Sequence, residues 1–146
     1  MPNACEYHDM GFNCCESVLS GLCDYLGEDT KLVPRIATGF GGGVGHTGDI
    51  CGAVSGAIMA LGIKFGRSSA DEKEKRDRLY LMVEEFLEHV RKELGSIDCF
   101  DLIGIKLNAV DGMKVYRENK LGKKCHRIIE QVDELARKFL ERETTP

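Results

Sequence analysis

The segment that most constrains the fold is a run of six glycines within residues 39–48, followed directly by small apolar residues. Glycine loses too much backbone entropy to hold a helix, so the run predicts a loop that ends at 47–49. The small residues after it predict a helix over 50–65. Glycines inside that helix, such as Gly52 and Gly56, each cost about 1 kcal/mol relative to alanine. That cost predicts tight packing, or a site, along one thin face of the helix.

Cys51 lies in the first turn of this predicted helix. The first N–H groups of a helix have no partner inside it, and the helix dipole places positive charge at the same end. Both effects favour a thiolate over a thiol, and the thiolate is the form that attacks disulfides and binds metals. The position of Cys51 therefore indicates cysteine chemistry without saying which kind.

Composition limits the class of protein. The chain has 146 residues, enough for one domain with a core, and its formal net charge of -4 argues against nucleic acid as a partner. Its longest apolar stretch, 50–65, is too short and interrupted for membrane insertion. The N-terminal residues lack the features of a signal peptide, so we expect a cytoplasmic protein. Seven cysteines in that reducing compartment favour metal binding or redox work over a disulfide framework.

Helical periodicity runs through most of the chain, and no segment has the clear alternation of a strand. We expect five helices, over residues 13–26, 31–38, 50–65, 69–94 and 123–142. A short helix over 98–103 is a minor element, and 104–122 is expected to be mostly loop. The sequence thus predicts an all-α, single-domain helical bundle over 1–146. In it, residues 1–10 are a mobile tail and 11–142 form the helical domain.

Four cysteines share a position at the start of a predicted helix: Cys14, Cys51, Cys99 and Cys125. If those helix starts converge, their free N–H groups and dipoles form a pocket for negative charge. One use of such a pocket is a pair of thiols that cycles between dithiol and disulfide. The other is a four-thiolate metal site, for zinc or an iron–sulfur cluster. Packing is the plainer explanation for any single cysteine, and it fits Cys23 on an apolar helix face.

The glycine loop is also a candidate for cofactor binding, through Gly41, Gly42, Gly43 and His46. It lacks the Gly-Lys-Ser/Thr ending of a phosphate-binding loop and has no strand before it, so nucleotide binding is a weak interpretation. We expect instead that the loop lets its backbone pass close to Cys51 or to the partner group of Cys51. His46 is a candidate base or ligand there, although a solvated loop histidine is the commoner case.

Together these pieces resemble the small C_GCAxxG_C_C proteins, a family described as redox-active. The matching parts are Asn13-Cys14, 39–43, 51–57, 95–99 and Cys125. The resemblance implies that the four hallmark cysteines of the family are Cys14, Cys51, Cys99 and Cys125. A similar domain in some multihaem redox proteins is associated with an iron–sulfur centre. This chain has no Cys-x-x-Cys-His, so we expect no covalently attached haem.

The leading hypothesis is a cytoplasmic redox-active protein that transfers electrons or disulfides to a redox partner protein. Cys51 would be the most reactive thiolate, with Cys14, Cys99 and Cys125 as resolving thiols or co-ligands. The alternative is a metal or iron–sulfur module with a four-thiolate site and no catalysis of its own. A third hypothesis is an interaction protein whose thin helix face, around Gly56, packs against a second copy in a homodimer.

Overall fold

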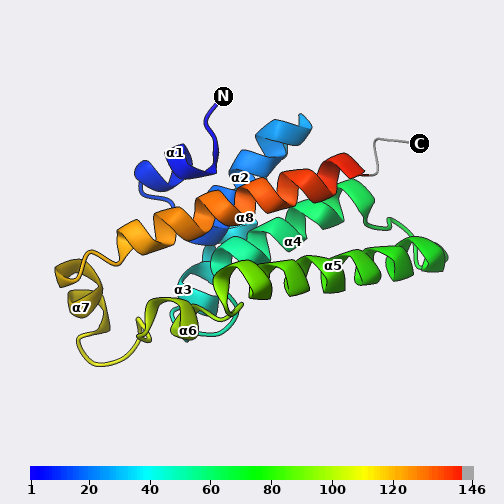
Figure 1. Ribbon diagram of the computed structural model, residues 1–146. Helices are drawn as coiled ribbons and strands as arrows, with labels where there is room; N and C mark the ends of the chain where they lie inside the picture. Colours follow the sequence, from blue (N-terminus) through cyan, green and yellow to red (C-terminus); the bar gives the residue numbers. More distant parts are fainter. Residues whose placement is uncertain (143–146) are drawn as a thin grey trace.

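The computed structural model describes residues 1–142. This part of the chain is all-α, as the sequence predicts, and it contains no β-strand, only one isolated bridge between Ile50 and Asp98. Figure 1 shows the eight α-helices in chain order. The elements are α1 (Ala4–Asp9), α2 (Cys14–Leu26), a 3₁₀-helix η1 (Arg35–Phe40), α3 (Gly41–Val44), α4 (Gly52–Phe65), α5 (Lys73–Leu94), α6 (Cys99–Ile103), α7 (Gly112–Glu118) and α8 (Gly122–Arg142).

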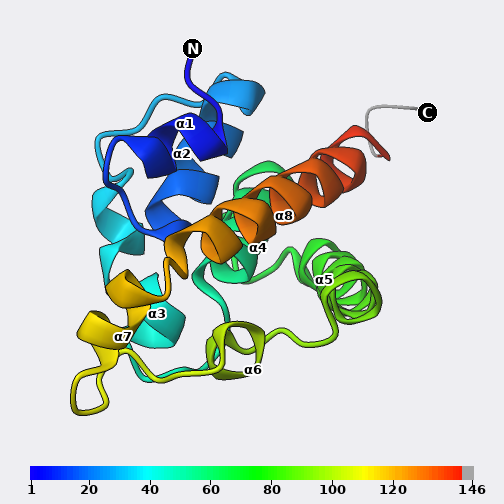
Figure 2. The same ribbon diagram turned by 60° about the vertical axis from the view of Figure 1, so that its left-hand side comes forward.

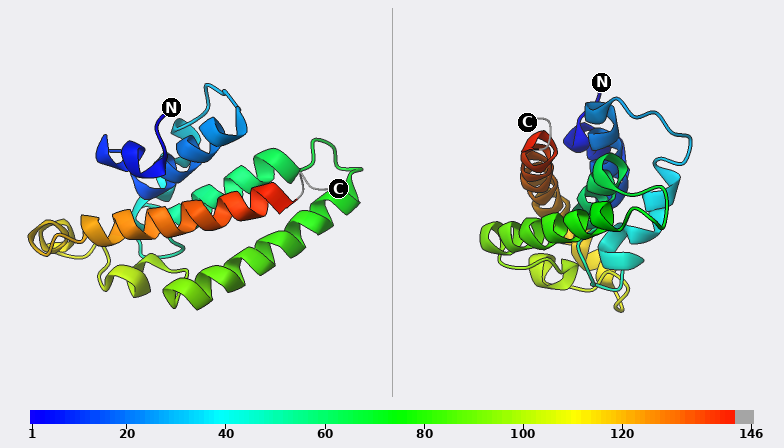
Figure 3. Two further views of the ribbon diagram at one scale, coloured as in Figure 1. Left: turned by 45° about the horizontal axis from the view of Figure 1, so that its top comes forward. Right: turned by 90° about the vertical axis from the view of Figure 1, so that its right-hand side faces the viewer.

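The core lies between α2, α4 and α8, which pack against one another. Helix α5 runs beside α4 and α8, and α1 packs on α2 and α8; Figures 2 and 3 show α5 on the opposite side of the molecule from α1 and α2. Helix α8 buries a stripe at helical spacing that extends from Cys125 to Leu140. Phe86 of α5 meets Phe139 of α8 edge to face, with 5.4 Å between ring centroids. This packing holds the starts of α2, α4 and α8 in fixed relation.

The thin face of α4 packs directly against α2. An ideal Cβ added at Gly56 would lie 2.8 Å from the carbonyl oxygen of Cys15, and one at Gly52 would lie 3.0 Å from the Cys15 nitrogen. The first distance is too short for a real side chain, and the second is tighter than most real contacts, so the two glycines let the backbones approach closely. The predicted tight packing is thus made within the chain, against α2.

Residues 4–9, which we expected within a terminal tail, form helix α1. A capping box starts it: Asn3 Oδ1 accepts from Glu6 N at 2.9 Å, and Glu6 Oε1 accepts from Asn3 N at 3.4 Å. Ala4 is buried against α2, where a Cβ at Gly21 would lie 2.6 Å from the Ala4 nitrogen. A six-residue helix depends on such packing, which the local sequence does not reveal.

Two predicted helices differ in their bounds. The helix expected over 31–38 is wrong, because turns precede Pro34 and a 3₁₀-helix follows it; the ring of Pro34 disfavours helical geometry at the residue before it. The helix expected over 69–94 begins at Lys73 instead. The side chain of Glu72 accepts from the backbone N–H groups of Ser68 and Ser69, at 3.0 Å each, and so holds a turn before the helix.

The segment 104–122, expected to be mostly loop, contains helix α7. This helix has seven residues, too few to show a periodic apolar stripe. Its first residue, Gly112, lies where a Cβ would be 2.6 Å from the carbonyl oxygens of Lys106 and Leu107. A close backbone approach, rather than local sequence preference, therefore fixes where α7 begins. Within the described residues, no helix combines the length and apolar character needed to cross a bilayer.

Helix α2 begins at a side-chain cap that also ties it to η1. Asn13 Oδ1 accepts from Glu16 N at 2.9 Å, and Asn13 Nδ2 donates to Thr38 O at 3.1 Å. We expect Asn13→Ala to lower the free energy of unfolding by about 1–2 kcal/mol, because both bonds are lost. Urea denaturation measures the change. The matched control is Asn108→Ala in an exposed loop; an equal loss in the two variants would contradict the role of the cap.

Candidate functional site

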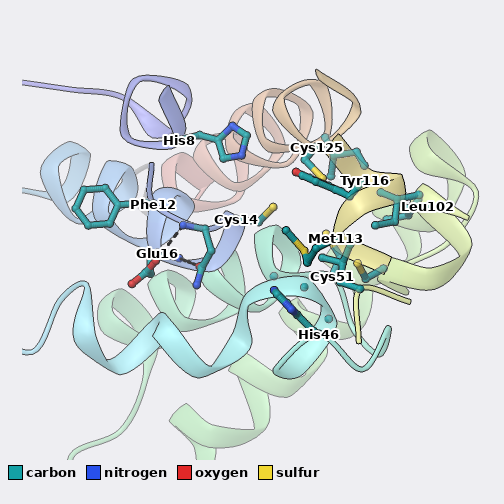
Figure 4. Close-up of a pocket in the computed structure, with 18 of the residues that line it drawn as sticks. His8, Phe12, Cys14, Glu16, His46, Cys51, Leu102, Met113, Tyr116 and Cys125 are labelled. Carbon is teal, nitrogen blue, oxygen red and sulfur yellow. Dashed lines mark hydrogen bonds between the residues drawn. The ribbon is translucent and has the colours of Figure 1, made fainter. Parts of the chain in front are cut away.

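The four cysteines at helix starts line one cavity of about 450 Å³, here called the cysteine cavity. Figure 4 shows the side chains of Cys14, Cys51 and Cys125 turned toward the same space from three different helices. Cys99, on α6, is the fourth cysteine that lines this cavity. Residues far apart in the sequence therefore meet at one end of the bundle, where α2, α4, α6 and α8 begin.

Cys14 and Cys125 influence each other's ionisation. Cys14 is the first residue of α2, directly after its cap, and Cys125 lies in the first turn of α8. Each of the two side chains is the largest influence on the pKa of the other. Because α2 and α8 pack against each other in the core, both residues belong to the rigid part of the fold.

Cys51 and Cys99 are held beside each other by the isolated bridge. The backbone N–H of Cys51 donates to Ile97 O at 2.7 Å, and that of Cys99 donates to Asp49 O at 2.8 Å. These bonds flank the antiparallel bridge between Ile50 and Asp98. The bridge thus joins the start of α4 to the start of α6 and brings a second pair of thiols to the cavity.

The electrostatics of the cavity favour a thiolate at Cys125. The hydrogen bond from Cys14 is the largest influence on Cys125; with a hydrogen bond from Tyr116 and the charge of Lys124 it outweighs burial and lowers the pKa of Cys125 to about 7. The same bond, together with burial, raises the pKa of Cys14 well above its ordinary value. The proton therefore stays on Cys14, which donates to the Cys125 sulfur.

The expectation that Cys51 carries the most reactive thiolate is not supported. Burial raises the pKa of Cys51 to about 11, even though the N–H groups of Val54 and Ala53 at the start of α4 act to lower it. Burial also raises the pKa of Cys99 to about 12. The N–H groups at the helix start do lower the pKa of Cys51, but the loss of solvation in this cavity raises it by more.

The glycine loop forms a left-handed turn beside the cavity. Five consecutive residues have positive φ between 60° and 72°: Gly42, Gly43, Val44, Gly45 and His46. Such a conformation is strained for a β-branched residue such as Val44, at a cost of roughly 1–3 kcal/mol. A Cβ at Gly43 would lie 2.6 Å from the Cβ of Cys99. The backbone of the turn therefore packs closely against Cys99, one member of the second thiol pair.

Three of the four loop residues proposed for cofactor binding line the cavity: Gly42, Gly43 and His46. The ring of His46 lies over Gly42, where an added Cβ would be 2.2 Å from the ring. Gly41 is outside the lining and packs on the side chain of Asn13, 2.5 Å from where its Cβ would be. The loop is thus one wall of the cavity, with His46 as its polar group.

The remaining cysteines lie elsewhere. Cys15 and Cys23 are buried in the core on α2, in line with the packing interpretation for Cys23. Cys5 lies on α1, and its thiol donates to the carbonyl oxygen of His126 at 3.8 Å. None of the three lines the cysteine cavity.

Tyr116 is a site residue that the sequence did not single out. It lies on α7, in the segment expected to be loop, and its hydroxyl lies beside the Cys125 sulfur in Figure 4. The same hydroxyl oxygen lies close to the start of α8, because an ideal Cβ at Gly122 would be 3.5 Å from it, an ordinary van der Waals distance. The sequence shows only a tyrosine six residues before Gly122. That spacing indicates a site residue only when α7 is known to fold back on α8.

Removal of the Tyr116 hydroxyl should raise the pKa of Cys125, because the thiolate loses a donor. We expect Tyr116→Phe to move the midpoint for Cys125 alkylation upward from about 7 by about one pH unit, which corresponds to about 1.4 kcal/mol. Iodoacetamide labelling across a pH series, read by peptide mass spectrometry, measures it. The control is Tyr80→Phe on the exposed face of α5. An unchanged midpoint in Tyr116→Phe would show that the Tyr116 hydroxyl does not stabilise the Cys125 thiolate.

The thiols have the donor chemistry for zinc or an iron–sulfur cluster, but their arrangement does not fit one. Within residues 1–142, no group of three or more His, Cys, Asp or Glu side chains is placed so that it could hold a metal ion. Cys51 and Cys99 are held by the bridge, whereas Cys14 and Cys125 come from the starts of α2 and α8. The expected metal centre is therefore not confirmed.

The comparisons with known proteins give one match. The sequence model of a family described as "Putative redox-active protein (C_GCAxxG_C_C)" matches residues 12–139, which is most of the chain and includes all four cavity cysteines. Neither the curated proteins nor the solved structures give a match.

Proposed function

The chain belongs to the C_GCAxxG_C_C family, and we propose that it is a thiol–disulfide redox protein whose working pair is Cys14 and Cys125. The observation that supports this most directly is that both thiols line one cavity, from the starts of two helices that pack together, where each is the largest influence on the pKa of the other. A thiolate that shares its cavity with a second thiol is suited to attack an external disulfide and then to close to an internal one.

In this proposal Cys125 is the nucleophile and Cys14 the resolving thiol. The Cys125 thiolate attacks an oxidised sulfur and forms a mixed disulfide, and Cys14 then attacks the Cys125 sulfur and releases the reduced product. Cys51 and Cys99 keep their protons at neutral pH because burial raises their pKa values. They line the cavity as neutral thiols and do not compete as nucleophiles.

Oxidation of the reduced protein by diamide tests the pairing. We expect two thiols to be lost, a Cys14–Cys125 disulfide in the peptide map, and full recovery with dithiothreitol. Cys23→Ala, a buried cysteine outside the cavity, should leave this result unchanged. A map in which Cys14 and Cys125 both stay reduced would reject the proposal.

The same preparation distinguishes the metal module. Protein purified under anaerobic conditions should contain less than stoichiometric iron and zinc if the dithiol proposal is right. Stoichiometric metal that is lost in Cys51→Ser would favour the four-thiolate site instead, because Cys51 is not part of the proposed working pair. Coloured protein with charge-transfer absorption would identify that metal as an iron–sulfur cluster.

A further inference from the structure

Three of the four cavity cysteines are buried, and the fourth, Cys14, is half-buried. Cys51 keeps 5% of its surface exposed, and Cys99 and Cys125 keep 8% each. They face a cavity of about 450 Å³, which is in the size range of small-molecule sites. Thiol–disulfide exchange requires the thiolate to reach one sulfur of the substrate directly. A disulfide fixed in a folded protein cannot enter such a cavity without local unfolding, whereas a small disulfide can.

The described residues that form the walls of the cavity carry negative charge and apolar side chains but no Lys or Arg. The apolar lining residues are Phe12, Leu102, Ile103, Leu107, Met113 and Ile128. The carboxylate of Glu16 accepts from Asn13 N at 2.9 Å and from Thr38 Oγ1 at 2.7 Å. Burial, and next the neighbouring His126, lower the pKa of His8, so its ring is uncharged at neutral pH. An anionic substituent would therefore face the Glu16 carboxylate and the Cys125 thiolate with no Lys or Arg to pair with, which is costly.

From the recessed cysteines and the lining that lacks Lys and Arg, we propose that the oxidant of this site is a small disulfide without anionic substituents, rather than a disulfide of a partner protein. The inference rests on the proposed function, because it assumes that Cys14 and Cys125 exchange with a disulfide. It departs from the expectation of a redox partner protein.

The exchange balances with the substrate as the only oxidant. The Cys125 thiolate attacks one sulfur of R–S–S–R, a Cys125–S–S–R bond forms, and the first R–S⁻ leaves and takes a proton from solvent. Cys14 then loses its proton to solvent and attacks the Cys125 sulfur. The Cys14–Cys125 bond forms and the second R–S⁻ leaves. Two protein thiols are oxidised, and one disulfide is reduced to two R–SH.

Three small disulfides of similar length and one protein, insulin, test the substrate class. The reduced protein is mixed with bis(2-hydroxyethyl) disulfide, cystamine, 3,3′-dithiodipropionate or insulin, and the loss of protein thiols is followed in one turnover. Each rate is divided by the rate of the same disulfide with the urea-unfolded chain, which removes differences in leaving group. We expect the normalised rates for bis(2-hydroxyethyl) disulfide and cystamine to exceed those for 3,3′-dithiodipropionate and insulin by about tenfold or more. The carboxylates of dithiodipropionate have no Lys or Arg to pair with in the cavity, at a cost of about 1.4 kcal/mol or more, and insulin is too large to enter it.

A change in cavity size tests the place of binding. Met113 is half-buried in the lining, and Figure 4 shows its side chain among the labelled cysteines. Met113→Trp should fill the space and lower the rate with the neutral disulfide by about tenfold, while Met113→Ala should keep or raise it. Met10→Trp, at an exposed methionine outside the cavity, is the matched control and should leave the rate unchanged.

The possible outcomes distinguish failure of this inference from failure of the proposed function. Insulin or 3,3′-dithiodipropionate that reacts as fast as bis(2-hydroxyethyl) disulfide would overturn the small-substrate inference and leave the dithiol proposal standing. Equal rates in Met113→Trp and Met10→Trp would overturn binding in the cavity. Failure of every disulfide and of diamide to form the Cys14–Cys125 bond would reject the proposed function itself.

Discussion

Serine at position 125 is expected to abolish the reversible loss of two thiols on oxidation. Cys125 has a pKa of about 7, so about half of it is thiolate at neutral pH. In Cys125→Ser the remaining candidate, Cys14, is still held by burial above the ordinary value. A thiol with a pKa of 9 or more is about 1% ionised at neutral pH, so attack on a small disulfide should slow by about fiftyfold or more.

Cys14→Ser should give a different result, which separates the two roles. Its Cys125 can still attack, but no resolving thiol follows, so the protein should accumulate a mixed disulfide with the substrate. Whole-protein mass spectrometry detects the added substituent. In Cys14→Ala, which removes the donor as well, the pKa of Cys125 should also rise, because the Cys14 side chain is the largest influence that lowers it. Cys23→Ser in the core is the control for the loss of a buried thiol.

Two results would contradict this assignment. Mixed disulfide at Cys51 or Cys99 in Cys14→Ser would move the nucleophile to the second pair. Unchanged reversible oxidation in Cys125→Ser would show that another pair of thiols does the work.

Local sequence was sufficient where a feature depends on neighbouring residues. The Asn13–Glu16 capping box predicts the start of α2 and therefore the place of Cys14. The apolar stripe of α8 predicts that helix and places Cys125 in its first turn. Gly52 and Gly56 predict a close backbone contact along α4, although the sequence does not say which element makes it.

Features that depend on distant residues were not predicted. The choice of Cys125 over Cys51 depends on which sulfur meets Cys14 and Tyr116 and how deeply each is buried. Helix-start position is the same for both, so the local argument could not rank them. The bridge between Ile50 and Asp98 joins segments far apart in the chain, and one residue pair gives no strand pattern to detect.

The left-handed turn packs against the second thiol pair, Cys51 and Cys99, and Gly43→Ala should disrupt it. A Cβ there would lie 2.6 Å from Cys99 Cβ, 2.7 Å from Asp49 O and 2.8 Å from Asp49 N. Two of these atoms are backbone, and Asp49 N also donates to Gly43 O at 2.9 Å. The neighbours therefore cannot yield by a side-chain rotation.

Gly27 provides the matched control for this substitution. It has φ +73°, against +72° at Gly43, but nothing lies within 4 Å of its ideal Cβ. Gly27→Ala should therefore cost only the left-handed conformation of an L-residue, about 1 kcal/mol. Gly43→Ala should cost the same amount plus overpacking, in total about 3 kcal/mol or more. Urea denaturation of the two variants measures the difference.

The functional consequence of Gly43→Ala follows from which atom it displaces. Cys99 has to move, and with it the bridge partner of the Cys51 segment, so the walls of the cavity shift while the Cys14–Cys125 pair on α2 and α8 does not. We expect Cys99 to react faster with a large thiol reagent such as Ellman's reagent, whereas diamide should still form the Cys14–Cys125 disulfide in the folded fraction. Equal losses of stability in Gly43→Ala and Gly27→Ala would contradict the close contact, and unchanged Cys99 reactivity would show that the turn does not hold the second thiol pair.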